Sequence, residues 1–282
     1  MASLLSVENL QVQFQTKKGI NTAVDGVSFS IEKGRILGIV GESGCGKSVT
    51  SMSILQLLGS NARISGGSIR LDGKELVGLP EKEMCKIRGN DIAMIFQDPM
   101  NALNPTLTIG SQLMEPIMLH QNCSKKEAWT RAVDVLKRVG IAAPEKRMKE
   151  YPHQLSGGMR QRVMIAMAVS CEPRLLIADE PTTALDVTIQ AQILELMCEL
   201  REKMGTAIML ITHDMGVVAE TADDVLVLYA GKAVEYGNIE DIFERPKHPY
   251  TQGLLNSIPR LDEDVEMLNT IEGTVPAPDA MP

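Results

Sequence analysis

The sequence predicts an α/β fold with a mostly parallel sheet, an N-terminal antiparallel β-subdomain and an inserted helical subdomain. Three observations predict it. Strand-like apolar runs alternate with helical stretches between residues 158 and 229. A glycine-rich loop around residue 45 lies between a short apolar run and a helical stretch. Residues 98–154 carry few strand signals. Alternating strands and helices imply parallel strands with helices on the faces of the sheet.

The elements follow in order along the chain. Alternating or short apolar runs predict strands at residues 5–14, 23–31, 36–40, 92–96, 174–178, 207–212 and 225–229. Helices are predicted at residues 49–58, 158–171 and 187–203. Ser124 and Glu127 have capping-box spacing and open another predicted helix that runs to Val139. Asp72-Gly73 and Gly231-Lys232 predict two hairpin turns.

Composition limits the function classes. The chain has 282 residues, a hydrophobic fraction of 44% and a net charge of −8, which argues against a general nucleic-acid surface. We find no apolar run near the roughly 18 residues of a membrane helix, and no secretory signal. The odd number of cysteines, without CxxC spacing, favours reduced thiols. We therefore expect a soluble cytoplasmic chain that acts on a membrane only through partners.

The glycine-rich loop matches G-x-x-x-x-G-K-[ST] and has a buried strand before it and a helix after it. Its backbone N–H groups and the Lys47 ammonium suit phosphate, and the Ser48 hydroxyl suits Mg²⁺. The pattern predicts a nucleoside triphosphate site. Its predicted residues are Gly41, Glu42, Ser43, Gly44, Cys45, Gly46, Lys47, Ser48 and Val49.

Polar residues at later strand ends complete the predicted chemistry. Asp179 and Glu180 follow a buried strand, and we expect Asp179 to hold Mg²⁺ through water and Glu180 to polarise the attacking water. His213 follows the next strand and is a candidate for the terminal phosphate. Gln97 follows the strand at residues 92–96 and is a candidate for sensing Mg²⁺ and the water.

Residues 155–161 form a second phosphate-binding surface. Ser156, Gly157 and Gly158 open a helix about twenty residues before the acidic pair, where no local phosphate is expected. This additional helix start indicates ATP shared between two subunits.

This set of residues resembles the nucleotide-binding subunit of an ATP-binding cassette (ABC) transporter, which implies a P-loop NTPase core. The resemblance covers roughly residues 5–235 and includes Ala184-Leu185-Asp186. It implies two subunits that face each other head to tail, with the Ser156 region of one closing on ATP held by the other. It also implies Glu180 as general base and Asp186 as part of a loop that communicates across the interface.

Two further stretches, residues 94–105 and 244–255, resemble the oligopeptide, dipeptide and nickel importer branch. The resemblance implies two permease subunits, a second and paralogous ATPase, and an external solute-binding protein, with this chain at the cytoplasmic face of the membrane. Di- or oligopeptide uptake is the main interpretation. Uptake of nickel, a metal chelate or glutathione is the alternative. A soluble cassette acting on DNA or ribosomes lacks support, as does an export or lipoprotein-release motor.

The resemblance divides the chain into a cassette at residues 1–238, with a helical subdomain at about 98–165, and a C-terminal extension at 239–282. Many members of the branch continue into a cysteine-containing segment associated with an iron–sulfur cluster. Either this member lacks that segment or the sequence given is shortened.

Two single residues carry separate hypotheses. Phe14 is the candidate for stacking on adenine, and an ordinary core phenylalanine is the alternative. Cys45 lies at a helix start, where a thiolate is favoured. We expect alkylation of Cys45 to inhibit ATP hydrolysis and bound ATP to protect it, although a small residue that fills space in the loop is the simpler explanation.

Overall fold

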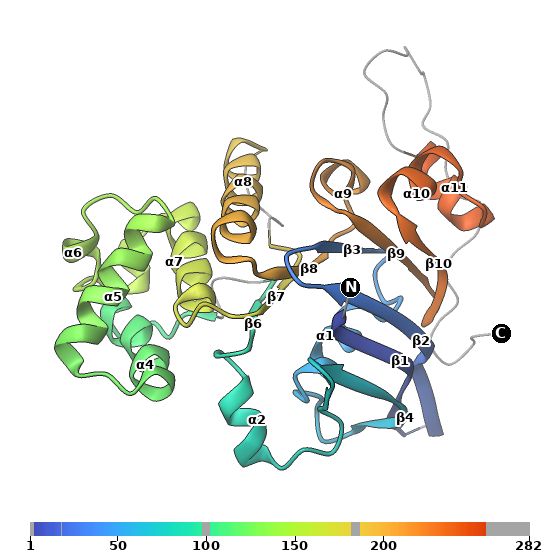
Figure 1. The fold of residues 1–282 in the computed structure, drawn as a ribbon, viewed down its shortest axis with the longest axis horizontal. Helices are drawn as coiled ribbons and strands as arrows, with labels where there is room; N and C mark the ends of the chain where they lie inside the picture. Colours follow the sequence, from blue (N-terminus) through green and yellow to red (C-terminus); the bar gives the residue numbers. More distant parts are fainter. Residues whose placement is uncertain (1–2, 18, 98–101, 182–186, 258–282) are drawn as a thin grey trace. The chain divides into compact units, whose positions relative to one another are not determined.

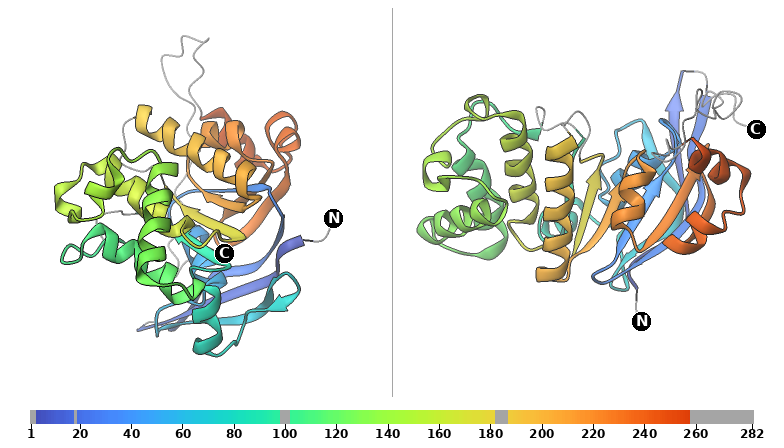
Figure 2. Two further views of the ribbon diagram at one scale, coloured as in Figure 1. Left: turned by 60° about the vertical axis from the view of Figure 1, so that its left-hand side comes forward. Right: turned by 90° about the horizontal axis from the view of Figure 1, so that it is seen from above.

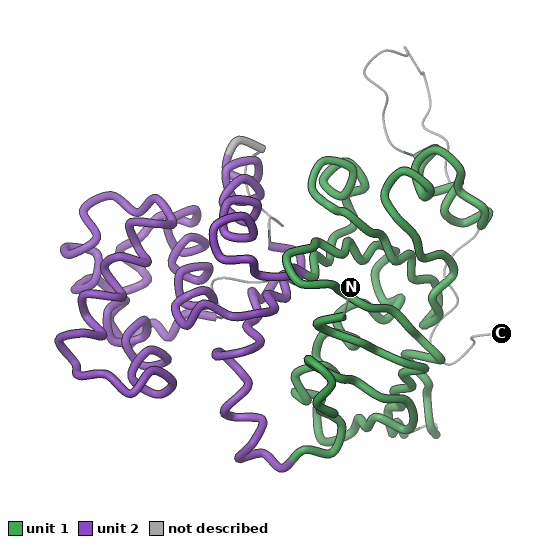
Figure 3. The backbone as a smooth tube through the Cα atoms, in the orientation of Figure 1, with its two compact units in different colours: residues 1–79, 209–282 green, residues 80–208 purple. Residues whose placement is uncertain are grey.

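The computed structural model describes residues 3–17, 19–97, 102–181 and 187–257. The chain divides into two compact units, residues 1–79 with 209–282 and residues 80–208, drawn in different colours in Figure 3. Among the described residues, no helix combines the length and the apolar character needed to cross a bilayer.

The first unit contains an antiparallel sheet, which confirms the predicted β-subdomain (Figure 1). Its strand order is β2-β1-β4-β5, from β1 (Ser3–Thr16), β2 (Gly19–Glu32), β4 (Ala62–Leu71) and β5 (Lys74–Glu75). Asp72 and Gly73 both have positive φ, 50° and 78°, as the predicted tight turn requires. Leu5, Val7, Leu10 and Val12 of β1 are buried.

The same unit contains the strand that leads into the glycine loop. β3 (Ile36–Val40) pairs in parallel with β9 (Asp224–Tyr229), and β9 pairs antiparallel with β10 (Lys232–Asn238). All five residues of β3 are buried. The unit also contains α1 (Lys47–Ile54), α9 (Met215–Thr221), α10 (Ile239–Glu244) and α11 (Pro249–Asn256). β8 (Ala207–Ile211) spans the boundary between the two units.

Helix α1 is shorter than the helix predicted at residues 49–58. It ends at Ile54 because Gln56 adopts a left-handed conformation with φ of 49°. The N–H of Leu57 donates to Met52 O and the N–H of Gln56 to Ser53 O, the pair of bonds that defines a Schellman end. The residue type at position 56 does not signal this end, since glycine usually takes that position.

The second unit combines a parallel strand pair with a group of helices. β6 (Ile92–Ile95) pairs in parallel with β7 (Leu175–Asp179). The parallel pairs in both units agree with the predicted α/β class. The helices are α2 (Glu81–Ile87), α4 (Ile109–Gln121), α5 (Lys125–Arg138), α6 (Pro144–Arg147), the 3-10 turn η1 (Pro152–Gln154), α7 (Gly157–Val169) and α8 (Val187–Met204).

Helices α4, α5 and α7 pack on one another (Figure 2). The predicted helical character of residues 98–154 is therefore confirmed for the part of this range that the structure describes. The capping box at Ser124 and Glu127 is present as predicted. At the start of α4, Gly110 N donates to Met148 O, and a Cβ on Gly110 would lie 2.6 Å from that oxygen. Only glycine allows this approach.

Candidate functional site

The glycine loop in the first unit has the backbone that its sequence predicts. Gly41, Gly44 and Gly46 have φ of 148°, 82° and 105°. A Cβ on Gly41 would lie 2.2 Å from the Leu228 carbonyl oxygen of β9, so no other residue fits there. Gly46 is the N-cap of α1 and has no side chain to cap the helix. The helix start therefore presents its backbone donors to the loop.

Lys47 is the central cation of this loop. Its side chain is 6% exposed, and its Nζ donates to Gly41 O at 2.6 Å and Glu42 O at 2.9 Å. Two carbonyl dipoles of the loop thus hold the ammonium in place, next to the N-terminus of α1. Ser48 is exposed and Val49 is half-buried on the first turn of the same helix. A buried ammonium beside a helix start is suited to a polyphosphate.

The expectation of a Cys45 thiolate is wrong. Burial raises the pKa of the Cys45 thiol, although the nearby Lys47 ammonium opposes that effect. The side chain is only 1% exposed. The helix-start argument failed because it ignored the loss of hydration, which disfavours the charged form. The alternative explanation, a small residue that fills space, fits this geometry better.

The glycine loop also has a partner that sequence reasoning missed. The N–H of Glu42 donates to the hydroxyl oxygen of Tyr250 in α11 at 3.0 Å, and Tyr250 is 7% exposed. On the other side of the loop, Gly231 N donates to Cys45 O at 3.1 Å. The only signal for Tyr250 was its place in the stretch at residues 244–255, which the sequence marked by resemblance and not by chemistry.

His213 lies where the sequence predicted, just after β8 in the first unit. Thr212 N donates to Ile39 O of β3 at 3.2 Å, so the end of β8 lies beside the strand that leads into the glycine loop. The Asp214 carboxylate caps α9 by accepting from Gly216 N and Val217 N. His213 is exposed between these two fixed residues. This placement supports its predicted role at the terminal phosphate, which stays a prediction.

Phe14 lies near the end of β1, opposite Asn21 of β2 and Ala62 of β4. Its side chain is half-buried. Stacking on adenine and ordinary packing both fit this position, so its role stays a prediction.

In the second unit, two predicted catalytic side chains meet. Ile95 of β6 is in register with Ala178 of β7, and Gln97 and Glu180 each follow two residues later. Gln97 Nε2 donates to Glu180 Oε2 at 2.7 Å. This bond uses the nitrogen of the amide, so its oxygen can face a metal ion. The pairing of Gln97 with Glu180 is a consequence of the parallel register.

Asp179 and Glu180 differ in their surroundings. Asp179 ends β7 and is 5% exposed. Glu180 has a left-handed φ of 45°, a conformation that costs a non-glycine residue about 1–3 kcal/mol. This backbone turns the chain immediately after the strand. The two carboxylates therefore stand in different environments on adjacent residues, as two distinct roles require.

The predicted helix start at residues 156–158 is present. Ser156 is the N-cap of α7, and its hydroxyl accepts from Met159 N at 3.4 Å. A Cβ on Gly157 would meet nothing within 4 Å, so this face of the helix start is open. The buried Gln161 side chain donates to Pro181 O, directly after Glu180. Helix α7 is thus hydrogen-bonded to the segment that directly follows Asp179 and Glu180.

A hollow of about 540 Å³ opens at this helix start. Ser156, Gly157 and Gly158 line it together with Arg147 and Arg162. The Arg147 guanidinium is paired with Glu150, and Arg162 donates to Val139 O and to Gln192. A helix N-terminus with two guanidinium groups nearby favours an anion.

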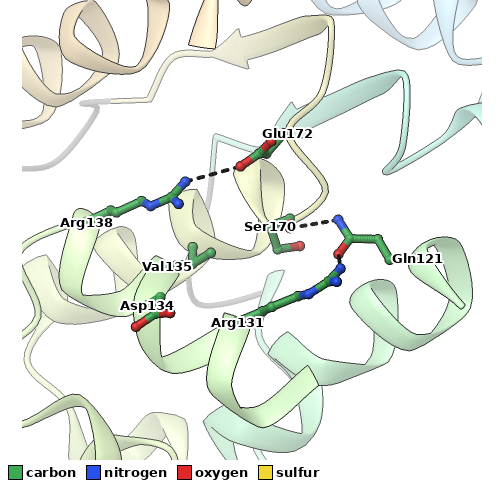
Figure 4. A pocket seen from close by; sticks show the side chains of 7 residues that line it. All are labelled: Gln121, Arg131, Asp134, Val135, Arg138, Ser170 and Glu172. Carbon is green, nitrogen blue, oxygen red and sulfur yellow. Dashed lines mark hydrogen bonds and ion pairs between the residues drawn. The ribbon is translucent and has the colours of Figure 1, made fainter. Parts of the chain in front are cut away.

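A second hollow of about 290 Å³ lies between the helices of this unit (Figure 4). Its arginines are engaged by neighbouring side chains: Arg138 pairs with Glu172 at 3.2 Å, and Arg131 donates to Gln121. Gln121 in turn donates to Ser170 O. These contacts join α4, α5 and α7, so the polar groups around this hollow serve the packing of the helices.

The candidate residues thus fall into two groups. The first unit holds the glycine loop, His213 and Phe14, and the second holds Gln97, Asp179, Glu180 and residues 156–158. Asp186 lies outside the described residues. Ser48, Gln97 and Asp179 all offer oxygen donors, which suits Mg²⁺.

Comparison with known proteins gives two family matches. A model described as "ABC transporter" matches residues 24–183, more than half of the chain. A model described as "Oligopeptide/dipeptide transporter, C-terminal region" matches residues 234–282, which include α10, α11 and Tyr250.

Curated relatives match over nearly the whole chain. An oligopeptide transport ATP-binding protein of Bacillus subtilis, AppD, is 57% identical over 100% of this chain and 86% of its own length. The dipeptide transport ATP-binding protein DppD of the same organism is 58% identical over 98% and 83%. The oligopeptide transport ATP-binding protein OppD of Escherichia coli is 56% identical over 97% and 81%.

Solved structures confirm the fold. The ATP-binding cassette MJ0796, described as a dimer in a post-hydrolysis state bound to ADP and Pi, aligns with a TM-score of 0.75 and 29% identity. The alignment covers 83% of this chain and 98% of that one. The protein cbiO1 from Clostridium perfringens, described as part of the ABC transporter complex cbiONQ, aligns with a TM-score of 0.74, also at 29% identity. That alignment covers 87% of this chain and 92% of cbiO1.

Proposed function

The chain belongs to the ABC transporter family, and from that premise we propose that it is the ATPase subunit of an importer of di- or oligopeptides. The observation that carries the proposal is the identity of 56–58% to oligopeptide and dipeptide transport ATP-binding proteins over nearly the full chain. The match at residues 234–282 adds a region described for the same transporters. Uptake of nickel, a metal chelate or glutathione has no comparable support.

The cassette binds ATP, and the glycine loop supplies the contacts. The Lys47 ammonium lies at the start of α1. There it would neutralise charge on the outer phosphates, and the N–H groups of the helix start would donate to their oxygens. Mg²⁺, when bound, would neutralise phosphate charge further, with Ser48, Gln97 and Asp179 as its oxygen donors. His213 would contact the terminal phosphate.

Hydrolysis needs a base, and Glu180 is placed for that role. Its Oε2 accepts from Gln97 at 2.7 Å, which fixes the direction of the carboxylate. We propose that this carboxylate polarises the attacking water. The left-handed backbone of Glu180 is a strained conformation of the kind that clusters at active sites.

The second helix start supports a site shared between two subunits. Ser156, Gly157 and Gly158 begin α7 beside an open hollow with two arginines. In a head-to-tail dimer these donors would close on ATP held by the Lys47 loop of the other subunit, and hydrolysis would remove that link. The dimeric state described for MJ0796 supports this arrangement. Asp186 would belong to the interface.

An importer ATPase of this family works with membrane permeases. We extend the proposal to two permease subunits, a second and paralogous ATPase, and an external solute-binding protein. The chain would then act as a peripheral subunit at the cytoplasmic face of the membrane. The domain assignment follows: a cassette at residues 1–238, a helical subdomain at about 98–165, and a C-terminal extension from 239.

Uptake measurements test the proposal. Cells that lack this chain should lose uptake of radiolabelled di- and oligopeptides, and the wild-type chain should restore it. Glu180→Gln, which keeps the size of the side chain but not the base, should bind ATP yet restore about 1% of uptake or less, because general-base catalysis contributes about 10²–10⁴-fold. Loss of nickel uptake with intact peptide uptake would contradict the proposal.

A further inference from the structure

Tyr250 joins the C-terminal extension to the glycine loop. It lies in the first turn of α11, and its hydroxyl oxygen accepts from Glu42 N–H at 3.0 Å. Its ring packs on Tyr229 of β9, with ring centroids 4.5 Å apart and an angle of 47° between the planes. The side chain is 7% exposed. A hydrogen bond shielded from water in this way is stronger than one exposed to solvent.

The peptide group that Tyr250 holds is also the one that holds Lys47. The Glu42 N–H and the Gly41 carbonyl belong to one planar peptide group. The Tyr250 hydroxyl oxygen accepts from the N–H of this peptide group, and Lys47 Nζ donates to its carbonyl oxygen at 2.6 Å. Because the group is planar, fixing one end sets the direction of the other. The hydroxyl thereby orients a carbonyl that positions the phosphate-binding ammonium.

Tyr250 is itself fixed from β10. The Glu235 carboxylate accepts from Lys247 N at 2.7 Å and from His248 N at 3.1 Å. His248 is the N-cap of α11, and its Nδ1 accepts from Tyr250 N at 3.2 Å. These bonds fix the start of the helix immediately before the tyrosine.

The tyrosine acts as a neutral group. Burial raises the pKa of Tyr250 to about 12, so the hydroxyl keeps its proton throughout the physiological range. A phenolate at this position would repel the phosphates of a nucleotide. The neutral hydroxyl orients the loop without that cost.

We infer that Tyr250 is a positioning residue for nucleotide binding, through which the C-terminal extension holds the Gly41–Glu42 peptide group and the Lys47 ammonium. This role rests on the proposed ATPase function. It gives α11, through Tyr250, an effect on the nucleotide site in the same subunit.

Tyr250→Phe tests the inference, because it removes the hydroxyl and keeps the ring against Tyr229. One neutral hydrogen bond contributes about 0.5–1.5 kcal/mol, so we expect KM for ATP to rise about twofold to tenfold while kcat changes less. Exchange of the Glu42 amide hydrogen in the nucleotide-free protein should become faster. The matched control is Tyr236→Phe, which removes a hydroxyl that donates to Ser30 O elsewhere in the same unit. It should leave both measurements unchanged.

The outcomes separate this inference from the proposed function. If the wild-type chain fails to bind ATP, the proposed function fails. If it binds ATP and Tyr250→Phe has the wild-type KM and Glu42 exchange, Tyr250 has no positioning role. Reduced thermal stability with an unchanged KM would also overturn the inference. Glu235→Gln, which weakens the acceptor that holds Lys247 and His248, provides a second variant, and it should raise KM in the same direction.

Discussion

The two glycine-containing helix starts of this protein, at α1 and α7, differ in which phosphate-binding groups each of them contains. At the start of α1, the N-cap residue Gly46 has no side chain that could cap the helix. The next residue, Lys47, supplies a buried ammonium that donates to two carbonyl oxygens of the loop. At the start of α7, Ser156 caps the helix with its own hydroxyl. The nearest cation in that sequence, Arg160, directs its Nε to Pro152 O and Leu155 O.

This difference indicates that the two helix starts have different functions. The α1 loop has its cation, its positive-φ glycines and the hydrogen bond to Tyr250 within one unit, so we expect it to bind phosphate by itself. The α7 start has backbone donors and an open hollow, but its ligand must come from elsewhere. The start of α1 should therefore determine ATP binding, and the start of α7 should determine whether the bound ATP is hydrolysed.

The largest expected effect comes from removing the cation of the first start. Lys47→Ala should lower ATP affinity by about 10²–10⁴-fold, because charge-assisted hydrogen bonds to phosphate contribute about 1.5–3 kcal/mol each. Titration calorimetry of the purified chain measures this. Wild-type affinity in the variant would mean that the α1 loop is not the phosphate site, so the two helix starts would not differ in the way described.

The next effect should separate hydrolysis from binding. Ser156→Glu places a negative charge at the α7 start, so ATP hydrolysis should fall by about 10²-fold or more, as on loss of donors to a developing charge. ATP affinity of the monomer should stay at the wild-type value. Steady-state hydrolysis and monomer binding are measured on the same preparation.

A matched control is available for this variant. Ser124→Glu makes the same change at the N-cap of α5, which has a capping box of its own. It should cost stability, about 1 kcal/mol for the lost cap, and leave hydrolysis intact. If Ser156→Glu weakened monomer binding as much as hydrolysis, the idea of a shared site would fail.

The smallest effect concerns the thiol of the first start. Because burial raises the pKa of Cys45, its reactive thiolate is scarce near neutral pH and becomes more abundant as the pH rises. Iodoacetamide should therefore modify the exposed Cys85 well before Cys45, and ATP hydrolysis should survive the first modification. Peptide mass spectrometry over a pH series measures both rates. Fast modification of Cys45 at pH 7 would contradict the buried geometry.

Much of the fold could be predicted from local pattern. The strand before the glycine loop is a run of five buried residues, and the capping box at Ser124 depends on two side chains three residues apart. Short helices such as α9 and α11 were missed, because seven or eight residues give too little periodicity to recognise. The early end of α1 was missed because Gln56 takes a conformation that its residue type does not suggest.

The sequence by itself determined which chemical groups this protein has and where they stand along the chain: the loop around Lys47, the acidic pair at Asp179 and Glu180, and the second helix start at Ser156. Only the tertiary structure decided which groups meet. Gln97 reaches Glu180 across 83 residues, and Tyr250 reaches Glu42 across 208. It also decided that Cys45 is buried. Local pattern depends on neighbours in the chain, whereas burial and long-range hydrogen bonds arise only when distant segments fold together.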